Sequence, residues 1–180
     1  MRTAEDVIRF WFVEHGMDDW FGGEAEFDAE LARQFADTHA RVALGEAWRW
    51  RETPEGRLAE IIVLDQFSRQ LHRGSPQAFA QDKMALVLAQ ETIAAGADQA
   101  IPTDRRMFLF MPFQHSESLL IQEEGCRHFV QFGEEMLKFM TDHRDTIRRF
   151  GRFPFRNAVL GRQSTPAEIA YMEEQKDRVF

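Results

Sequence analysis

Helix starts are clearly marked along this chain of 180 residues. A hydroxyl side chain that can cap a helix stands directly before a proline, which favours the first helical position, at Thr53-Pro54, Ser75-Pro76 and Thr165-Pro166. Glu168 follows Thr165 by three residues and completes a capping box. Strict two-residue alternation and Asn-Gly or Asp-Gly turns, which signal strands and hairpins, are absent. The sequence therefore predicts an all-α fold.

The same signals, with the glycines and prolines between apolar stretches, divide the chain into about eight helices. They are expected near residues 3–15, 24–44, 54–72, 76–95, 104–111, 115–131, 134–149 and 165–178. No linker, low-complexity segment or shift in composition marks a domain boundary. We therefore expect a single all-helical domain over residues 1–180.

Composition narrows the class of protein. The chain has 22 Lys and Arg against 30 Asp and Glu, so it lacks the basic surface typical of nucleic-acid-binding and membrane-surface proteins. The single cysteine, Cys126, excludes an internal disulfide framework and a multi-cysteine zinc site. No apolar run approaches the roughly 18 residues of a membrane span, and the first residues do not resemble a signal peptide. We expect a cytoplasmic protein that binds neither nucleic acid nor membranes.

The aromatic residues are dominated by phenylalanine, with 17 Phe against one Tyr. Because phenylalanine carries no polar group, most of these rings should lie in the core. This applies to Phe10-Trp11-Phe12 and to the stretch 107–113.

The familiar catalytic and cofactor motifs are missing. There is no Gly-rich nucleotide loop, no His-Glu-x-x-His, no Cys-x-x-Cys and no Gly-x-Ser-x-Gly. No cofactor is therefore expected. Four possible nitrogen and oxygen ligands show no recognised metal spacing, so no metal site is predicted: Asp65, His72, His115 and Glu117.

Polar residues continue an apolar stripe of the expected helix 54–72. At 100° per residue, Asp65, Arg69 and His72 fall on the stripe begun by Leu58. Asp65 and Arg69 are four residues apart, which permits an ion pair. Since the opposite side of the helix is also apolar, the helix should be buried. The stripe is then either a buried ion pair that ties helices together or the polar floor of a pocket.

His115 is a candidate for chemistry on the next polar stretch. If the chain is helical from residue 115, His115 shares a face with Leu119, Gln122 and Cys126, while Glu117 points away. A histidine on such a stripe is either a hydrogen-bonded core residue or an acid/base group. Cys126 is expected to be a small buried residue.

Residues 144–162 form a basic segment in an acidic chain. The six arginines are Arg144, Arg148, Arg149, Arg152, Arg156 and Arg162. With one aspartate they give a charge of +5, which leaves −13 for the rest of a chain whose net charge is −8. Guanidinium groups bind carboxylates and phosphates through paired hydrogen bonds. The arginines therefore either bind an anionic ligand or pair with carboxylates of the same chain. Gly151, Pro154 and Gly161 predict a loop, where binding sites are common.

Several runs, in this order, resemble the bacterial family known as domain of unknown function 924. They are LDQFSRQLHRG (64–74), AFAQDKMAL (78–86), FLFMPFQHSE (108–117) and RFGRFPFRNAVLGRQSTPAE (149–168). The resemblance covers the chain from Phe10 to the last expected helix. It implies antiparallel helix pairs similar to tetratricopeptide repeats, and no established activity. The family's motif positions fall on Asp65, Gln66, Phe67, Arg69, His115, Ser116, Glu117, Arg149, Phe150, Gly151, Arg152, Pro154, Arg156 and Asn157.

The chain departs from the family pattern at three positions. It has Ser68 in place of the usual proline, Gln114 in place of glutamate and Phe155 in place of histidine. If the family's glutamate and histidine formed an acid/base pair, this chain has lost both. The possible site then consists of Asp65, Arg69, His115 and the basic segment.

We favour the hypothesis of a binding module for an anionic small molecule or an acidic peptide. The ligand would be held by Arg149, Arg152, Arg156 and Asn157, above a floor made by Asp65 and Arg69. Under this hypothesis, Arg152→Ala weakens ligand binding without unfolding the protein. A loss of melting temperature without ligand would instead make the basic segment structural.

Two other hypotheses stay open. A hydrolase or transferase acting on a phosphorylated or carboxylated metabolite would use His115 as its acid/base group, with Asp65 orienting a partner and the arginines stabilising charge. That enzyme requires His115 to face the basic segment. A scaffold without a ligand site is the third hypothesis, and the sequence leaves the oligomeric state open.

Overall fold

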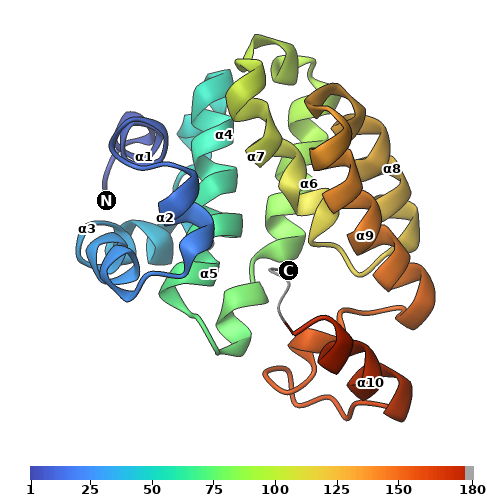
Figure 1. Cartoon of the computed structure of the whole chain (residues 1–180). Helices are drawn as coiled ribbons and strands as arrows, with labels where there is room; N and C mark the ends of the chain where they lie inside the picture. Colours follow the sequence, from blue (N-terminus) through green and yellow to red (C-terminus); the bar gives the residue numbers. More distant parts are fainter. Residues whose placement is uncertain (177–180) are drawn as a thin grey trace. The chain divides into compact units, whose positions relative to one another are not determined.

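The computed structural model describes residues 1–176, which form helices joined by short connections (Figure 1). No β-strand occurs in this part of the chain, so the prediction of an all-α fold is confirmed. The chain separates into two compact units. Unit 1 consists of Met1–Arg73 and Gln77–Pro112, and unit 2 consists of Gly74–Pro76 and the residues from Phe113 onward. The single domain over residues 1–180 and the repeat-like array of helix pairs stay predictions.

Unit 1 contains the N-terminal helices, drawn from blue to green in Figure 1. Its α-helices are α1 (Ala4–Arg9), α2 (Met17–Gly22), α3 (Ala25–Ala43), α4 (Pro54–Ile62), α5 (Ser68–Leu71), α6 (Asp82–Ala94) and most of α7 (Thr103–Gln114). They are joined by two π-helical turns, η1 (Phe10–Glu14) and η3 (Val63–Phe67), and by the 3-10 turns η2 (Trp48–Glu52), η4 (Pro76–Phe79, which begins in unit 2) and η5 (Ala97–Ala100).

The short helix α2 stands where the sequence suggested only a connection rich in glycine. Asp19 caps it, because its carboxylate accepts a hydrogen bond from the Gly16 N–H at 3.3 Å. The flanking glycines concealed this helix of six residues in the sequence.

The stretch α4–η3–α5 is the predicted buried helix of unit 1. The Thr53 hydroxyl accepts a hydrogen bond from the Gly56 N–H at 3.0 Å, and Pro54 occupies the first turn, as the sequence predicted. Every residue from Leu58 to Ser68 is buried. The prediction that this helix is buried on both sides is confirmed.

Aromatic rings dominate the core. Trp11 is fully buried, and its ring centroid lies 5.5 Å from those of both Trp20 and Phe108. The Trp20 Nε1–H donates to the Trp11 carbonyl at 2.9 Å, which satisfies one polar group inside this cluster. The buried phenylalanines of the described chain are Phe10, Phe27, Phe35, Phe67, Phe108, Phe110, Phe113, Phe129 and Phe153, in agreement with the composition.

Apart from Gly74–Pro76, unit 2 runs from the last residues of α7 onward and contains the elements drawn from yellow to red in Figure 1. Its elements are α8 (Leu119–Phe129), η6 (Val130–Phe132), α9 (Glu134–Phe150), η7 (Pro154–Arg156) and α10 (Pro166–Glu174). Helices α8 and α9 lie side by side (Figure 1). The basic segment runs from the last turns of α9 into the loop that leads to α10.

The expectation that a helix begins at residue 115 is wrong. Helix α7 ends at Gln114 and α8 begins at Leu119, so His115 lies in a connection and not on a helical face. The Gln122 amide donates to the carbonyls of Gln114 and Ser116 at 2.6 and 2.8 Å. This side chain satisfies carbonyl groups that the end of a helix leaves without partners.

Gly56 provides a test of the packing at the start of α4. A Cβ atom at this position would overlap the Trp50 carbonyl oxygen and lie 2.8 Å from the Trp50 carbonyl carbon. We expect Gly56→Ala to cost about 1–3 kcal/mol, as overpacking does, which corresponds to roughly 2–4 °C of melting temperature per kcal/mol. Circular dichroism during heating measures the change. Gly22→Ala is the control, because its Cβ would meet only the Glu24 Cγ at 3.5 Å. Equal melting temperatures for the two variants would contradict this account.

Candidate functional site

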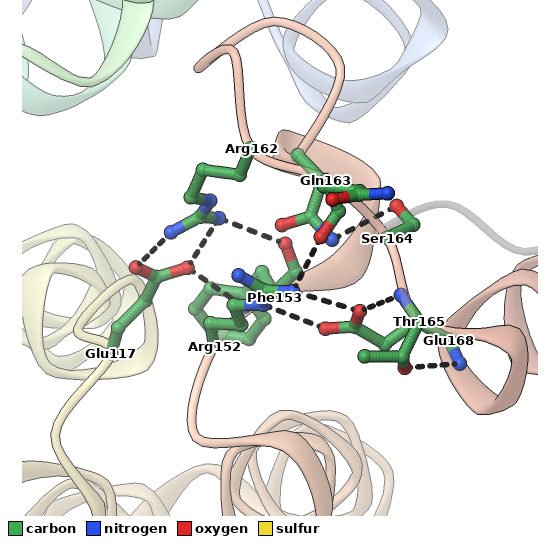
Figure 2. Close-up of polar contacts among 9 residues, drawn as sticks. Glu117, Arg152, Phe153, Arg162, Gln163, Ser164, Thr165 and Glu168 are labelled. Carbon is green, nitrogen blue, oxygen red and sulfur yellow. Dashed lines mark hydrogen bonds and ion pairs between the residues drawn. The ribbon is translucent and has the colours of Figure 1, made fainter.

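Glu117, in the connection between α7 and α8, holds the loop that follows α9 (Figure 2). Arg162 Nη1 and Nη2 donate to its two carboxylate oxygens at 2.7 and 2.9 Å. The Phe153 N–H donates to the same carboxylate at 2.7 Å, and Arg162 also donates to the Phe153 carbonyl at 3.2 Å. One carboxylate therefore holds both ends of the loop 153–162. The sequence interpretation had Glu117 pointing away on a helix, and it missed this role.

Glu168 holds the other side of the same loop (Figure 2). Arg152 Nε and Nη2 donate to its carboxylate at 2.7 and 2.9 Å, and the Thr165 N–H donates at 2.7 Å. The Thr165 hydroxyl accepts from the Glu168 N–H at 3.3 Å, so the predicted capping box is confirmed. Glu168 is only 2% exposed. It therefore starts α10 and also neutralises an arginine of the basic segment.

Both carboxylates are held in their charged form. Burial alone would raise the pKa of Glu117, but the hydrogen bonds from Arg162 and the Phe153 N–H outweigh it and the pKa is lowered. The pKa of Glu168 falls from 4.5 to about 2, first because of the hydrogen bonds from Arg152 and then because the Thr165 N–H donates to it.

Most arginines of the basic segment have carboxylate partners within unit 2. Arg144 Nη2 and Arg148 Nη1 lie 2.8 and 2.6 Å from Asp145 Oδ1. Arg152 and Arg162 form such pairs with Glu168 and Glu117. This is the internal pairing that one of the two sequence interpretations required. The ligand-binding role of Arg152 stays a prediction.

Arg149 is held by aromatic rings. Its guanidinium carbon lies 4.7 Å from the ring centroid of Phe150 and 5.7 Å from that of Tyr171. The residue is exposed, and no carboxylate within residues 1–176 forms an ion pair with it. Arg149 therefore differs from its neighbours, because its guanidinium lies over aromatic rings and has no counter-ion in the described chain.

Beside Arg149 is a hollow of about 190 Å³ between α9 and α10. Its other lining residues are Asp142, Asp145, Thr146, Tyr171 and Gln175. The hydroxyl groups of two lining residues, Thr146 and Tyr171, form a hydrogen bond at 2.8 Å. Apart from Arg149, the sequence interpretation proposed none of these residues as ligand-binding, because α10 offered no pattern that placed it beside α9.

Arg156 and Asn157 lie at the end of η7. The Arg156 guanidinium carbon lies 4.6 Å from the ring centroid of Phe153. Asn157 is fully buried, and its Nδ2 donates to the Ser164 hydroxyl at 3.0 Å. Asn157 therefore supports the conformation of the loop. A ligand-binding role for these two residues stays a prediction.

His143 on α9 is a candidate residue that sequence reasoning missed. Its Nδ1–H donates to the Phe139 carbonyl at 2.9 Å, and the Gln114 amide nitrogen lies 3.3 Å from both ring nitrogens. Burial is the first cause that lowers the pKa of His143 to about 4, and the charges of His115 and Arg156 also lower it. His143 is therefore neutral near pH 7.

The same electrostatic influence places His115 and Arg156 in one neighbourhood around His143. His115 is half-buried in the connection after α7. The available signal for His143 was its spacing from Met140 and Ile147, which puts it on the buried face of the expected helix 134–149. The acid/base role predicted for His115 stays a prediction.

Asp65 and Arg69 belong to unit 1. Arg69 Nη1 lies 3.3 Å from the Oδ1 atom of the fully buried Asp65, so the predicted ion pair four residues apart is confirmed. Gln66 Nε2 also donates to Asp65, and Arg69 Nη2 lies 3.0 Å from Asp82 Oδ1. These contacts bind α6 to the π-helical turn η3. The roles of Asp65 and Arg69 as a pocket floor or in catalysis stay predictions.

Among residues 1–176, no group of three or more His, Cys, Asp and Glu side chains could hold a metal ion. No helix in the same part of the chain has the length and apolar character needed to cross a membrane.

The depressed pKa of Glu168 predicts a specific pH dependence of stability. Its folded pKa of about 2 lies below the ordinary 4.5, so its stabilising contribution is present above about pH 4.5 and is lost as the pH falls toward 2. We expect Glu168→Gln, whose amide can still complete the capping box, to lower the melting temperature at about pH 6. The difference from the wild-type protein should shrink as the pH falls to about 2, because both chains then lack the charge.

Thermal unfolding at a series of pH values measures this difference. Glu173→Gln is a matched control, because Glu173 is 74% exposed and pairs only with Lys176 among the ion pairs of the described chain. A difference between wild type and Glu168→Gln that stays constant from about pH 6 to about pH 2 would show that the ionised carboxylate is not what stabilises this loop.

A family model and a solved structure are similar to this chain over most of its length. Residues 7–176 match the sequence model of a family described as "Bacterial protein of unknown function (DUF924)". A solved structure of a protein of unknown function from Agrobacterium tumefaciens is similar over 95% of this chain and 97% of that chain, with 40% identity and a TM-score of 0.91. No protein with a curated description matches. The resemblance seen in the sequence motifs is confirmed, and the chain belongs to the DUF924 family of bacterial proteins of unknown function.

Proposed function

We propose that this protein binds a small molecule through an anionic group, and that Arg149 holds this group beside the hollow between α9 and α10. The observation that carries the proposal is the state of Arg149. Its guanidinium is exposed, lies over the rings of Phe150 and Tyr171, and has no ion-pair partner within residues 1–176. A guanidinium held over a ring keeps N–H groups at its edge for paired hydrogen bonds to a carboxylate or phosphate.

The charge distribution supports the same assignment. The basic segment is surrounded by an acidic chain, and four of its arginines pair with carboxylates of unit 2. Those arginines would have to give up an internal partner to bind a ligand. Arg149 would not, so an anion gains the full interaction there.

The first test compares variants of adjacent arginines. We expect Arg149→Ala to weaken binding of an anionic ligand by about tenfold or more, because a charge-assisted pair of hydrogen bonds is lost. Arg149→Lys should bind the ligand with an affinity between those of the wild type and Arg149→Ala. Lysine keeps the positive charge but cannot form the paired hydrogen bonds of a guanidinium. A thermal-shift screen against phosphorylated metabolites, dicarboxylates and amino acids identifies the ligand, and calorimetry measures its affinity.

Arg148→Ala is the matched control, because Arg148 is also exposed on α9 but pairs with Asp145. Its affinity should stay close to that of the wild type. Unchanged binding in Arg149→Ala would contradict the proposal. If no compound with an anionic group raised the melting temperature, the protein would instead be interpreted as a scaffold without a ligand site.

A second candidate function, an enzyme that uses His115 as its acid/base group, has one observation in its favour. The pKa of His143 is lowered by the charges of His115 and Arg156, so two imidazoles and a guanidinium share one neighbourhood. In this candidate His115 transfers the proton, and Arg156 stabilises negative charge on a phosphorylated or carboxylated substrate.

Hydrolysis of p-nitrophenyl phosphate and p-nitrophenyl acetate tests this candidate. We expect His115→Ala to lower kcat by about 100-fold or more while the melting temperature stays near the wild-type value. His128→Ala, at another half-buried histidine of unit 2, is the control. Absence of wild-type turnover on both substrates, or equal turnover in wild type and His115→Ala, would count against the enzyme.

A further inference from the structure

We infer that the ligand of the Arg149 hollow is zwitterionic, with a cationic group directed at Asp142 and Asp145 while its anionic group binds Arg149. This inference rests on the proposed function, because it takes Arg149 as the anchor of the anionic group. It goes further by naming the class of ligand.

The positive and the negative side chains of the hollow lie at opposite ends of one face of α9. Asp142, Asp145 and Arg149 line the hollow from α9, at intervals of three and four residues. With a rise of about 1.5 Å per residue, Asp145 lies about 6 Å and Asp142 about 10 Å from Arg149 along the helix axis. A ligand in the hollow therefore meets positive charge at one end and negative charge at the other.

The hydrogen bond between the Thr146 and Tyr171 hydroxyls, which belong to the lining of the hollow, has a defined direction. Thr146 Oγ1 donates its hydrogen to the Asp142 carbonyl at 2.9 Å. Because a hydroxyl has one hydrogen, the 2.8 Å contact between the Thr146 and Tyr171 hydroxyls must have Tyr171 as the donor. The Tyr171 oxygen then offers only lone pairs to a ligand.

Gln175 adds a further acceptor to the lining. Its Oε1 atom is buried, and no donor within residues 1–176 forms a hydrogen bond with it. A buried acceptor without a donor costs free energy that a ligand N–H would recover. The hollow thus combines one cationic donor, Arg149, with acceptors from four residues: Asp142, Asp145, Tyr171 and Gln175.

This balance disfavours a ligand that carries only negative charge. Two carboxylates within about 10 Å repel such a ligand and leave the acceptors of the hollow without donors. Asp142 and Asp145 already pair with cations of unit 2, namely Lys138, which is 66% exposed, Arg148, which is 48% exposed, and the half-buried Arg144. An ionised carboxylate has about four lone-pair sites, so it can accept from an ammonium group in addition to such a partner.

Three compounds with the same carbon skeleton test the inference by calorimetry on the full chain: 6-aminohexanoate, hexanoate and hexylammonium. We expect 6-aminohexanoate to bind about 1.5-fold to fivefold more tightly than hexanoate, the range that follows from one added pair between exposed charges. Hexylammonium should bind more weakly than 6-aminohexanoate, because it lacks the group that Arg149 holds.

Variants then assign the preference to the aspartates. Asp145→Asn and Asp142→Asn keep the volume of the side chain and should remove most of the preference for 6-aminohexanoate without weakening hexanoate. Arg149→Ala should weaken both compounds. Glu135→Gln, an exposed position at the start of α9, is the control and should leave both affinities unchanged.

The outcomes separate this inference from the proposed function. If hexanoate binds as tightly as 6-aminohexanoate and both depend on Arg149, the zwitterion is wrong and anion binding stands. If hexylammonium alone matches 6-aminohexanoate, or the preference survives in both asparagine variants, the zwitterion is also wrong. If neither hexanoate nor 6-aminohexanoate binds and Arg149→Ala changes the affinity of no anionic compound, both proposals fail.

Discussion

The fork between Arg162 and Glu117 is the contact on which the loop after α9 depends. It joins residues 45 positions apart, and the Phe153 N–H donates to the same carboxylate. Removing either partner would leave the other as a partly desolvated charge without a counter-ion. Arg152 and Glu168 repeat this arrangement at the start of α10. Both guanidinium groups are thus paired with carboxylates of unit 2, which is why the proposed ligand site relies on Arg149 instead.

Arginine is a single residue type in the composition, but it has three environments in unit 2. In the first, a carboxylate with little exposure takes the guanidinium in a fork, as Glu168 takes Arg152. In the second, Arg144 and Arg148 share the exposed Asp145, which contributes little to stability. In the third, the Arg149 guanidinium lies over two aromatic rings and is exposed to solvent. The total charge of the basic segment therefore does not indicate how many of its positive charges are accessible to a ligand.

Local signals predicted most of the fold, and distant contacts explain what was missed. The capping box at Thr165 and the proline start at Thr53 were readable because each depends on residues within one helical turn. The break at residues 115–118 was missed, since it depends on how Gln122 bonds to the end of α7. The role of Glu117 was missed for the same reason. Asp65 and Arg69 were paired correctly because they lie one turn apart, whereas the contact of Arg69 with Asp82 had no local signature.

The double role of Glu168 has a consequence for motion. The carboxylate that caps the first turn of α10 is also the one that neutralises Arg152, so unwinding that turn releases the arginine of the preceding loop. Loop and helix should then open as one cooperative unit, with similar protection against amide hydrogen exchange. Tyr171, on α10, forms a wall of the hollow and belongs to that unit. A ligand seated against this ring would slow the exchange of amides in a loop that it does not touch.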